Sequence, residues 1–287
     1  MKQPTTNGPN ADQIEFWSGR VGEKWVEYQP RLDAMMASIT RALVEAAEPT
    51  AGERVLDVGC GCGDLAFEVA RRVRPGGAVT GIDVSEVMLA HARTLAAAQG
   101  LTITYEHADA ETHAFPASAH DLMVSRFGVM FFRNPGRAFA NIARALRPDA
   151  RLAFACWQAR ELNPWLRLPW DAAARHVAFD ELAGEEEPGP HSLARRGRVE
   201  AILAEAGLTD VCLTSLELAL NVGATRKLED AVDFVLNVGP VARALAEAEP
   251  GPRARAVSDI REAFAKHHGD RGVELGAAVW LVTARRP

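Results

Sequence analysis

The chain has 287 residues, 48% of them hydrophobic and 24% charged, a composition typical of a globular protein with a sizeable core. Its 32 basic and 38 acidic side chains give a net charge of −6, which argues against a general nucleic-acid binder. No apolar run reaches about 18 residues, and the polar N-terminus lacks the hydrophobic stretch of a signal peptide. We therefore expect a cytoplasmic protein without a membrane-spanning segment.

The predicted elements begin with a polar tail and a helical region, which together occupy residues 1–50. From Ile14 to Ala47 the apolar residues recur every three or four positions, as on one face of a helix. From residue 51 to 157, short apolar runs alternate with helical segments. The expected strands are, in order, 55–58, 78–83, 103–105, 122–125 and 151–157. This alternation predicts an α/β fold with a doubly wound, mostly parallel sheet.

The alternation stops after Trp157. Residues 158–198 are rich in Pro, Trp and Gly, and we expect them to form a cap inserted after the fifth strand, over one face of the sheet. Residues 199–287 return to the core with a helix and two further strands at 211–220 and 277–283, separated by helices. The sheet is therefore predicted to have seven strands.

A glycine-rich turn is the most informative segment. Residues 55–64 read Val-Leu-Asp-Val-Gly-Cys-Gly-Cys-Gly-Asp, with three alternate glycines between a strand and a helix. Such a turn lets the backbone approach a ligand at the N–H groups of the helix, although many α/β proteins need glycine there for the turn alone. Asp64 replaces the last glycine of the dinucleotide fingerprint, and Asp57 would repel a pyrophosphate. Asp57 instead suits a ligand that carries a cationic amino group.

Two further acids follow successive strands. Asp83 ends the second strand, where α/β nucleoside-binding proteins place a carboxylate on the ribose hydroxyls; the alternative is an ordinary acid at a helix start. Asp109 follows the third strand, where a carboxylate could accept from an adenine amino group and the Ala110 amide could meet a ring nitrogen. Together with Asp57 they favour a site for a cationic nucleoside.

Residues 55–64, 81–83 and 109–111 resemble the first motifs of class I S-adenosylmethionine-dependent methyltransferases. The wider pattern, through residues 115–116, 121–125 and 146–148, is similar to the ubiquinone/menaquinone-biosynthesis branch, which acts on small molecules. The resemblance covers roughly residues 54–157 and implies a Rossmann-like core with an N-terminal helical lid. Two small residues depart from the pattern: Cys62, where Thr or Ser is common, and Ala108, where Gly often precedes the acid.

The resemblance implies S-adenosylmethionine as the cofactor, and each matching position acquires an expected role. The amino-acid end would lie against Asp57, Gly59, Cys60, Gly61 and Gly63, the ribose against Asp83, the adenine against Val84, Met88, Asp109 and Ala110, and the methionine side against Ser125 and Arg126.

Trp25 and Tyr28 lie three residues apart and would share one helix face. One interpretation is that they pack against the sheet. The other is that they form part of a lid whose aromatic face covers the sulfonium, through a cation–π contact that also excludes water. We include both among the candidate cofactor contacts.

The predicted cap carries the candidates for binding and activating the methyl acceptor, or for holding the cap together: Trp165 and Trp170 as substrate contacts, and His176 and His191 as general bases. No metal is expected, because Cys60 and Cys62 lack two further ligands at metal spacing.

The predicted function is methyl transfer to a small-molecule acceptor, with neither nucleic acid nor membrane as a partner. The residues do not distinguish an O, N or C acceptor atom, and they leave the oligomeric state undetermined. A cyclase or decarboxylase that binds the same cofactor remains an alternative, which formation of S-adenosylhomocysteine would exclude. Asp57 and Asp64 disfavour a nicotinamide-dependent oxidoreductase, and the complete set of cofactor residues disfavours a non-catalytic binding module.

Overall fold

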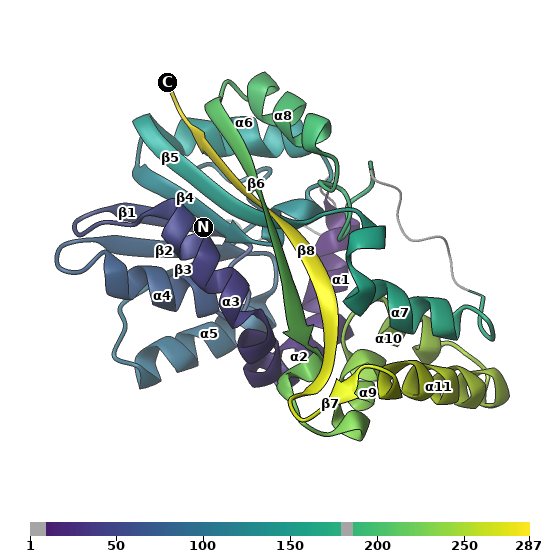
Figure 1. Cartoon of the computed structure of the whole chain (residues 1–287). Coiled ribbons are helices and arrows are strands. Elements are labelled where there is room, and N and C mark those ends of the chain that lie inside the picture. Colours follow the sequence, from purple (N-terminus) through teal and green to yellow (C-terminus); the bar gives the residue numbers. More distant parts are fainter. Residues whose placement is uncertain (1–9, 179–185) are drawn as a thin grey trace.

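The computed structural model describes residues 10–178 and 186–287; the remainder of the predicted tail and of the predicted cap lies outside the described residues. A twisted open sheet forms the centre (Figure 1), in the order β3-β2-β1-β4-β5-β8-β6, with the short β7 paired to β8. Its strands are β1 (Arg54–Val58), β2 (Ala78–Asp83), β3 (Thr104–His107), β4 (His120–Arg126), β5 (Leu146–Trp157), β6 (Thr209–Asn221), β7 (His268–Gly269) and β8 (Gly272–Arg285).

The first five strands pair in parallel, whereas β8 runs antiparallel to both of its main neighbours. This confirms the predicted doubly wound, mostly parallel sheet, and all seven predicted strands are present. β1 and β4 are buried on both faces, as their near-continuous apolar sequence indicates. β7 was not predicted, because two residues give no periodic pattern.

Helices cover both faces of the sheet (Figure 1). One layer contains α3 (Gln29–Ala47), α4 (Asp64–Arg72) and α5 (Glu86–Ala98), and the other contains α6 (Pro135–Ala145) and α8 (Arg196–Glu205). The start of α5 is set by Ser85, whose hydroxyl accepts the amide of Met88 as an N-cap does. Fully buried Phe139 and Phe154 contact each other between the sheet and the second layer.

The N-terminal region is divided into three helices rather than one. α1 (Ala11–Ser18) and α2 (Arg20–Glu27) meet at Gly19, and α2 ends at Tyr28, where α3 begins. α2 lies so close to the start of α5 that a β-carbon at Gly22 would stand 2.9 Å from the Ser85 hydroxyl. α3 packs on β4 and β5 as part of the core, whereas α1 and α2 lie against the ends of the strands.

The cap is assembled from two parts of the chain. The insertion contributes a 3-10 turn (Arg160–Leu162) and α7 (Pro164–Ala173), and α7 packs against α10 (Pro240–Ala246) and α11 (Pro250–Ala265). These two helices and α9 (Leu228–Asn237) come from the segment between β6 and β8. Sequence analysis expects this segment to be helices inserted in the C-terminal part of the core, and Figure 1 shows α9, α10 and α11 beside α7 at one end of the molecule.

Candidate functional site

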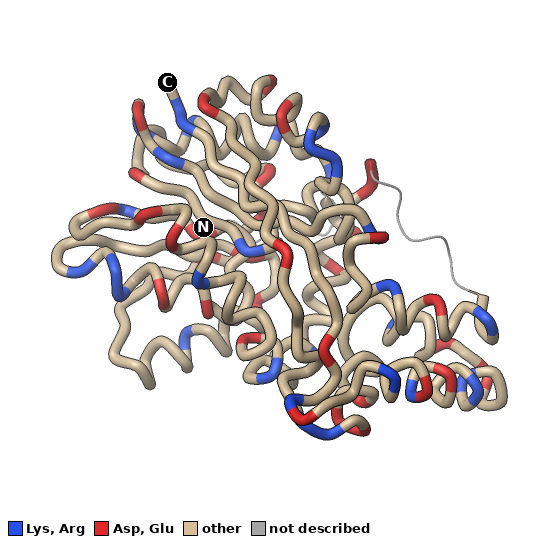
Figure 2. The backbone as a smooth tube through the Cα atoms, viewed as in Figure 1, with Lys and Arg blue, Asp and Glu red and all other residues tan. Residues whose placement is uncertain are grey.

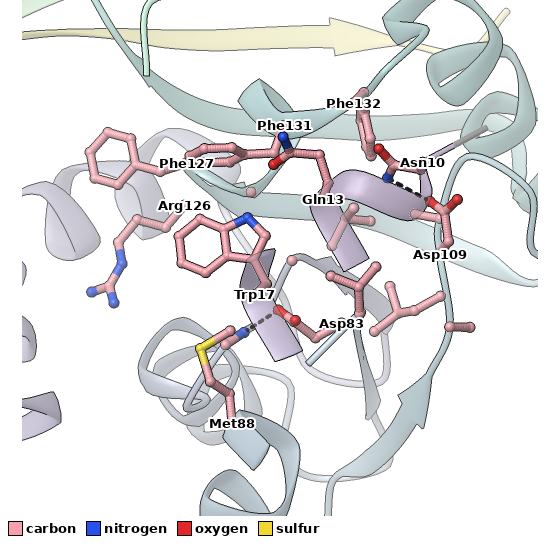
Figure 3. Close-up of a pocket in the computed structure, with 18 of the residues that line it drawn as sticks. Asn10, Gln13, Trp17, Asp83, Met88, Asp109, Arg126, Phe127, Phe131 and Phe132 are labelled. Atoms are coloured by element: carbon pink, nitrogen blue, oxygen red, sulfur yellow. Dashed lines mark hydrogen bonds between the residues drawn. The ribbon is translucent and has the colours of Figure 1, made fainter. Parts of the chain in front are cut away.

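A cavity opens at the carboxyl ends of β1 to β4, with about 700 Å³ of space, part of it open to solvent (Figure 3). The loop after β1 lines it with Gly59 and Gly61, and α1 and α2 cover it from the other side. In an open parallel sheet this edge, where the strand order reverses between β1 and β4, is the usual ligand-binding position.

The glycine-rich turn needs glycine for two reasons. Gly59, Gly61 and Gly63 all have positive φ angles (67°, 53° and 94°), which side chains disfavour. In addition, a β-carbon at Gly59 would stand 2.6 Å from the α-carbon of Gly128, and one at Gly128 would stand 2.7 Å from the α-carbon of Gly59. The loops after β1 and β4 therefore touch backbone to backbone at the floor of the cavity.

Asp57 lies beneath this turn and is completely buried. Neither carboxylate oxygen has a hydrogen-bond partner of regular geometry among the described residues. Burial, and then the negative charges of Asp83 and Asp64, raises its pKa to about 8 against the opposing effects of Arg126 and the Ala66 amide. An unpaired acid of this kind fits a ligand with a positive charge, which would stabilise the carboxylate.

Asp83 lines the cavity at the end of β2. Its carboxylate accepts the amides of Gly61 at 2.8 Å and Ser85 at 2.9 Å, which fixes its position. Burial raises its pKa, although these amides and His107 act in the opposite direction. Each carboxylate oxygen can accept more than one hydrogen bond, so capacity remains for hydroxyl groups of a ligand.

Asp109 lies further along the same wall, beside Ala110, with Val84 and Met88 on neighbouring elements. Its carboxylate accepts hydrogen bonds from the Glu111 amide at 3.0 Å and from the Thr112 hydroxyl at 3.3 Å, and both donors belong to the turn that follows Asp109. The structure thus brings the four residues predicted for an adenine to one part of the cavity.

Arg126 lines the opposite end of the cavity and joins two helices beneath it. Its guanidinium lies 2.5 Å from Asp64, 2.6 Å from the Thr40 hydroxyl and 3.2 Å from Asp33. Burial alone would lower the pKa of Arg126, but the two carboxylates outweigh it and raise that pKa. The two carboxylates of Asp33 and Asp64 exceed the single guanidinium, so this end favours a ligand with a net positive charge.

Five predicted cofactor contacts lie outside the lining of the cavity: Tyr28, Asp57, Cys60, Gly63 and Ser125. Asp57, Cys60 and Gly63 are packed behind the turn, and Ser125 is fully buried, where its hydroxyl donates to the Val58 carbonyl at 2.6 Å. The Ser125 side chain therefore links β4 to β1. Arg126, which was predicted to contact the methionine part of the cofactor together with Ser125, lines the cavity, but Ser125 does not.

Trp25 lines the cavity, but Tyr28 does not. Tyr28 is buried against Phe234 of α9 and donates a hydrogen bond to Asp233, and its predicted contact with the cofactor stays a prediction. Burial, and then the bond to Asp233, raises the pKa of Tyr28 to about 12. Tyr28 packs among the buried residues of the core, as the first of its two interpretations expects.

Trp17 of α1 also enters the cavity (Figure 3). Its indole makes edge-to-face contacts with Trp25, at 5.4 Å between ring centres, and with Phe131, at 4.9 Å. Sequence analysis placed Trp17 in the apolar repeat of a helix and assigned it no role. Periodicity finds the buried face of a helix without revealing whether that face meets a core or a cavity.

A row of aromatic rings runs from the cavity toward the cap. Phe127, at the end of β4, has the unusual φ angle of +69° for a non-glycine residue and stacks on Trp157 at 4.2 Å. Trp157 contacts Trp165 of α7 at 5.0 Å, and the buried indole nitrogen of Trp165 has no hydrogen-bond partner among the described residues. Trp165 is thus connected to the cavity through two rings, whereas Trp170 packs beneath the Arg160 guanidinium.

Neither candidate base lines the cavity. The Nε2 atom of His176 lies 2.9 Å from Asp259, where the end of α7 meets α11, and Nδ1 of His191 lies 3.3 Å from the Gln158 carbonyl. Their roles as bases stay predictions. Sequence analysis also missed Asn10 and Gln13, which line the cavity from α1, because a polar segment at the chain start resembles a tail.

Among residues 10–178 and 186–287, no helix is long and apolar enough to cross a membrane. The same part of the chain has no group of three His, Cys, Asp or Glu side chains placed to hold a metal ion.

Comparison with protein families identifies residues 55–149 as a methyltransferase domain. Two curated relatives are aklanonic acid methyltransferase of Streptomyces sp. (strain C5), 42% identical over 40% of this chain, and nocamycin O-methyltransferase of Saccharothrix syringae, 38% identical over 60%. The matches cover 52% and 65% of those proteins, so the chain spans about half to two thirds of their length. Demethylmenaquinone methyltransferase of Thermus thermophilus is 38% identical over 39% of this chain and 50% of its own length.

The fold is also found in solved structures. That of a protein described as a methyltransferase from Bacillus halodurans superimposes with a TM-score of 0.58 and 20% identity, over 87% of this chain and 99% of that chain. The cyclase SpnF superimposes with a TM-score of 0.56 and 21% identity, over 94% and 96%. At these identities the likeness concerns the fold, which is that of the Rossmann-like methyltransferases.

Proposed function

We propose that this chain, whose core is a class I S-adenosylmethionine-dependent methyltransferase domain, transfers the cofactor's methyl group to a small-molecule acceptor. The observation that carries the proposal is the cavity at the ends of β1 to β4, which combines the glycine-rich turn with the carboxylates of Asp83 and Asp109. The curated relatives named as methyltransferases support the same activity. From the composition we also infer a cytoplasmic location and no nucleic-acid partner.

The residues of the cavity suit each part of S-adenosylmethionine. Asp57 and the acids around Arg126 would stabilise the positive amino-acid end, Asp83 would accept the ribose hydroxyls, and Asp109 would accept from the adenine amino group. The cofactor supplies an activated methyl group on a sulfonium. Trp17 and Trp25 face this region, so their rings can exclude water and interact favourably with a cation.

The acceptor would enter between the cavity and the cap, along the aromatic row of Phe127, Trp157 and Trp165. Flat rings favour a planar apolar acceptor, and the unpartnered indole N–H of Trp165 can donate to an oxygen of that molecule. Trp170 lies further into the cap, where it would support α7. The chain's contribution is then mainly alignment of donor and acceptor in a dry site.

The test is formation of S-adenosylhomocysteine together with a methylated product, followed by mass spectrometry with methyl-labelled cofactor. Aklanonic acid is the first acceptor to try, because the relative named for it is 42% identical over the matched region. Turnover of an acceptor without any S-adenosylhomocysteine would instead favour the cyclase alternative, for which the fold of SpnF is a precedent.

Binding is tested separately by thermal shift with S-adenosylhomocysteine and with NAD. We expect micromolar affinity for the former, about 8 kcal/mol of binding free energy, and none for the latter. Stabilisation by NAD alone would contradict the proposal.

A further inference from the structure

Asn10 stands immediately before α1, in the position of a helix N-cap, but its side chain makes no capping hydrogen bond. Asparagine at this position ordinarily accepts an amide of the first turn. Here the side chain turns away from its own helix, and its Nδ2 atom donates to Asp109, 99 residues along the chain, at 3.4 Å. Asn10 is only 5% exposed and lines the cavity (Figure 3).

The orientation of the Asn10 amide follows from its partner. An ionised carboxylate only accepts hydrogen bonds, so the NH2 end must face Asp109 and the Oδ1 atom must face elsewhere. Oδ1 is buried and has no hydrogen-bond partner among the described residues. A buried carbonyl oxygen without a donor is unfavourable, so this atom requires a donor from a ligand in the cavity.

Two acceptors therefore lie next to each other on the same wall: Oδ1 of Asn10 and the carboxylate of Asp109. The Asp109 carboxylate receives bonds from the Glu111 amide and the Thr112 hydroxyl and keeps free lone pairs. A group with two N–H bonds can satisfy two neighbouring acceptors at once, and the exocyclic amine of adenine is such a group. A ring carbonyl in the same place would face acceptors only.

We propose that Asn10 and Asp109 together form a pocket for the exocyclic amino group of adenine, so that α1 takes part in selecting the nucleobase. The inference rests on the proposed function and adds to it a specificity-determining residue on the lid. It also explains how α1 is positioned. Asn10 ties its beginning to Asp109, and the hydroxyl of Ser18 ties its end to the Val84 carbonyl at 3.1 Å. Both tethers reach the wall that faces the adenine.

The experiment compares S-adenosylhomocysteine with S-inosylhomocysteine, which carries a carbonyl oxygen in place of the amine and a proton on the adjacent ring nitrogen. Their affinities are measured by calorimetry for the wild-type chain, for Asn10→Leu and for Glu15→Gln. The change at the ring nitrogen is the same for every variant, so the role of Asn10 is read from how the preference differs between variants. Leucine matches asparagine in size without its polar atoms. Glu15 is an exposed residue of the same helix outside the cavity lining and serves as the matched control.

We expect the wild-type chain and Glu15→Gln to prefer the adenosyl ligand strongly. Asn10→Leu should bind it about tenfold more weakly, the equivalent of losing one hydrogen bond, and should show a smaller preference. Equal weakening of both ligands in Asn10→Leu would contradict the inference and assign Asn10 a purely structural role. Failure of the wild-type chain to bind S-adenosylhomocysteine would contradict the proposed function itself.

Discussion

The hydroxyl of Tyr28 donates a 2.8 Å hydrogen bond to Asp233 of α9, and this contact fixes the junction between α2 and α3 to the cap. Arg31, one turn further along α3, donates to the carbonyls of Gly223 and Asp230. α3 is therefore held by the core and by the cap, whereas α1 and α2 are held mainly at the cavity. We infer that the predicted lid ends at Tyr28.

We therefore predict that residues 11–27 become ordered when the cofactor binds, and that α3 is unaffected. The contacts of Tyr28 and Arg31 hold the start of α3 in place, so the predicted lid ends before them. Closing the lid costs conformational entropy, which contacts with the ligand would offset. Hydrogen exchange with and without S-adenosylhomocysteine measures this: slower exchange is expected in 11–27 alone. Equal protection of that segment in both states would mean that α1 and α2 are permanent parts of the fold.

Substitution of Trp25 should affect turnover more than cofactor affinity. Trp25→Ala removes a ring from the cavity and the contact that supports Trp17, so water would reach the reacting centre. We expect kcat to fall about tenfold or more, with a smaller change in the dissociation constant of S-adenosylhomocysteine. Tyr28→Phe is the matched control, because it loses the bond to Asp233 and should lose about 1 kcal/mol of stability with little change in kcat. The reverse pattern would place Trp25 in the core.

Asp83 should contribute directly to cofactor affinity. Asp83→Asn keeps one oxygen for the Gly61 or the Ser85 amide and places its NH2 group against the other amide. It also loses the charge that strengthens hydrogen bonds from ribose hydroxyls. We expect a loss of about 1.5–3 kcal/mol in the binding of S-adenosylhomocysteine, measured by calorimetry. Exposed Glu86, at the start of the next helix, provides the control Glu86→Gln. Unchanged affinity in folded Asp83→Asn protein would exclude the ribose role.

Asp57 makes stability depend on pH in an unusual direction for an acid. The folded chain holds this proton until its pKa of about 8, whereas an exposed aspartate releases it near pH 4. The proton on Asp57 therefore stabilises the folded chain fully below about pH 4. As the pH rises from there toward 8, this stabilisation is lost and the free energy of unfolding falls. The size of this fall is on the order of 3–5 kcal/mol.

Urea unfolding of the wild-type chain and of Asp57→Asn, at several pH values between 5 and 8, tests this. The free energy of unfolding should change with pH more steeply in the wild-type chain than in Asp57→Asn, since asparagine does not titrate. Cofactor binding should oppose the effect, because its ammonium group stabilises the charged carboxylate and drives the proton off. Affinity for S-adenosylhomocysteine should then increase from pH 6 to pH 8. Parallel pH profiles for the two proteins would contradict the raised pKa.

His176 should act in the cap and not in catalysis. Its imidazole contacts Asp259 between α7 and α11 and does not line the cavity. His176→Ala is therefore expected to lower the melting temperature slightly and to leave the rate of methyl transfer unchanged. A large loss of kcat with retained stability would return His176 to the role of general base.

The core of the fold and much of the lining of the cavity could be predicted because both depend on local patterns. Alternating strands and helices determine the parallel sheet, and the carboxyl ends of its strands bring Asp83 and Asp109 to the same edge. Their place beside the glycine turn followed from chain order alone. The Ser85 cap of α5 is equally local, since it needs only a side-chain acceptor, here the serine hydroxyl, before the first turn of the helix.

The rest depends on contacts between distant segments. The sequence around Tyr28 does not predict its hydrogen bond to Asp233, 205 residues away, and the sequence around Asn10 does not predict its hydrogen bond to Asp109. Tertiary packing also decides that α7 meets α11, so the cap has two sources in the chain. Trp17 shows the limit of periodicity, which marks an apolar face but not what that face covers.

The contact between Gly59 and Gly128 has a consequence for how this chain can vary. The two residues belong to loops 69 positions apart, but each occupies the space that a methyl group on the other would need. Neither residue can acquire a side chain while the other stays in place, so the two positions form a single steric constraint. Alanine at either one would separate β1 from β4 at the cavity floor, and both single variants should therefore lose ligand binding through the same displacement.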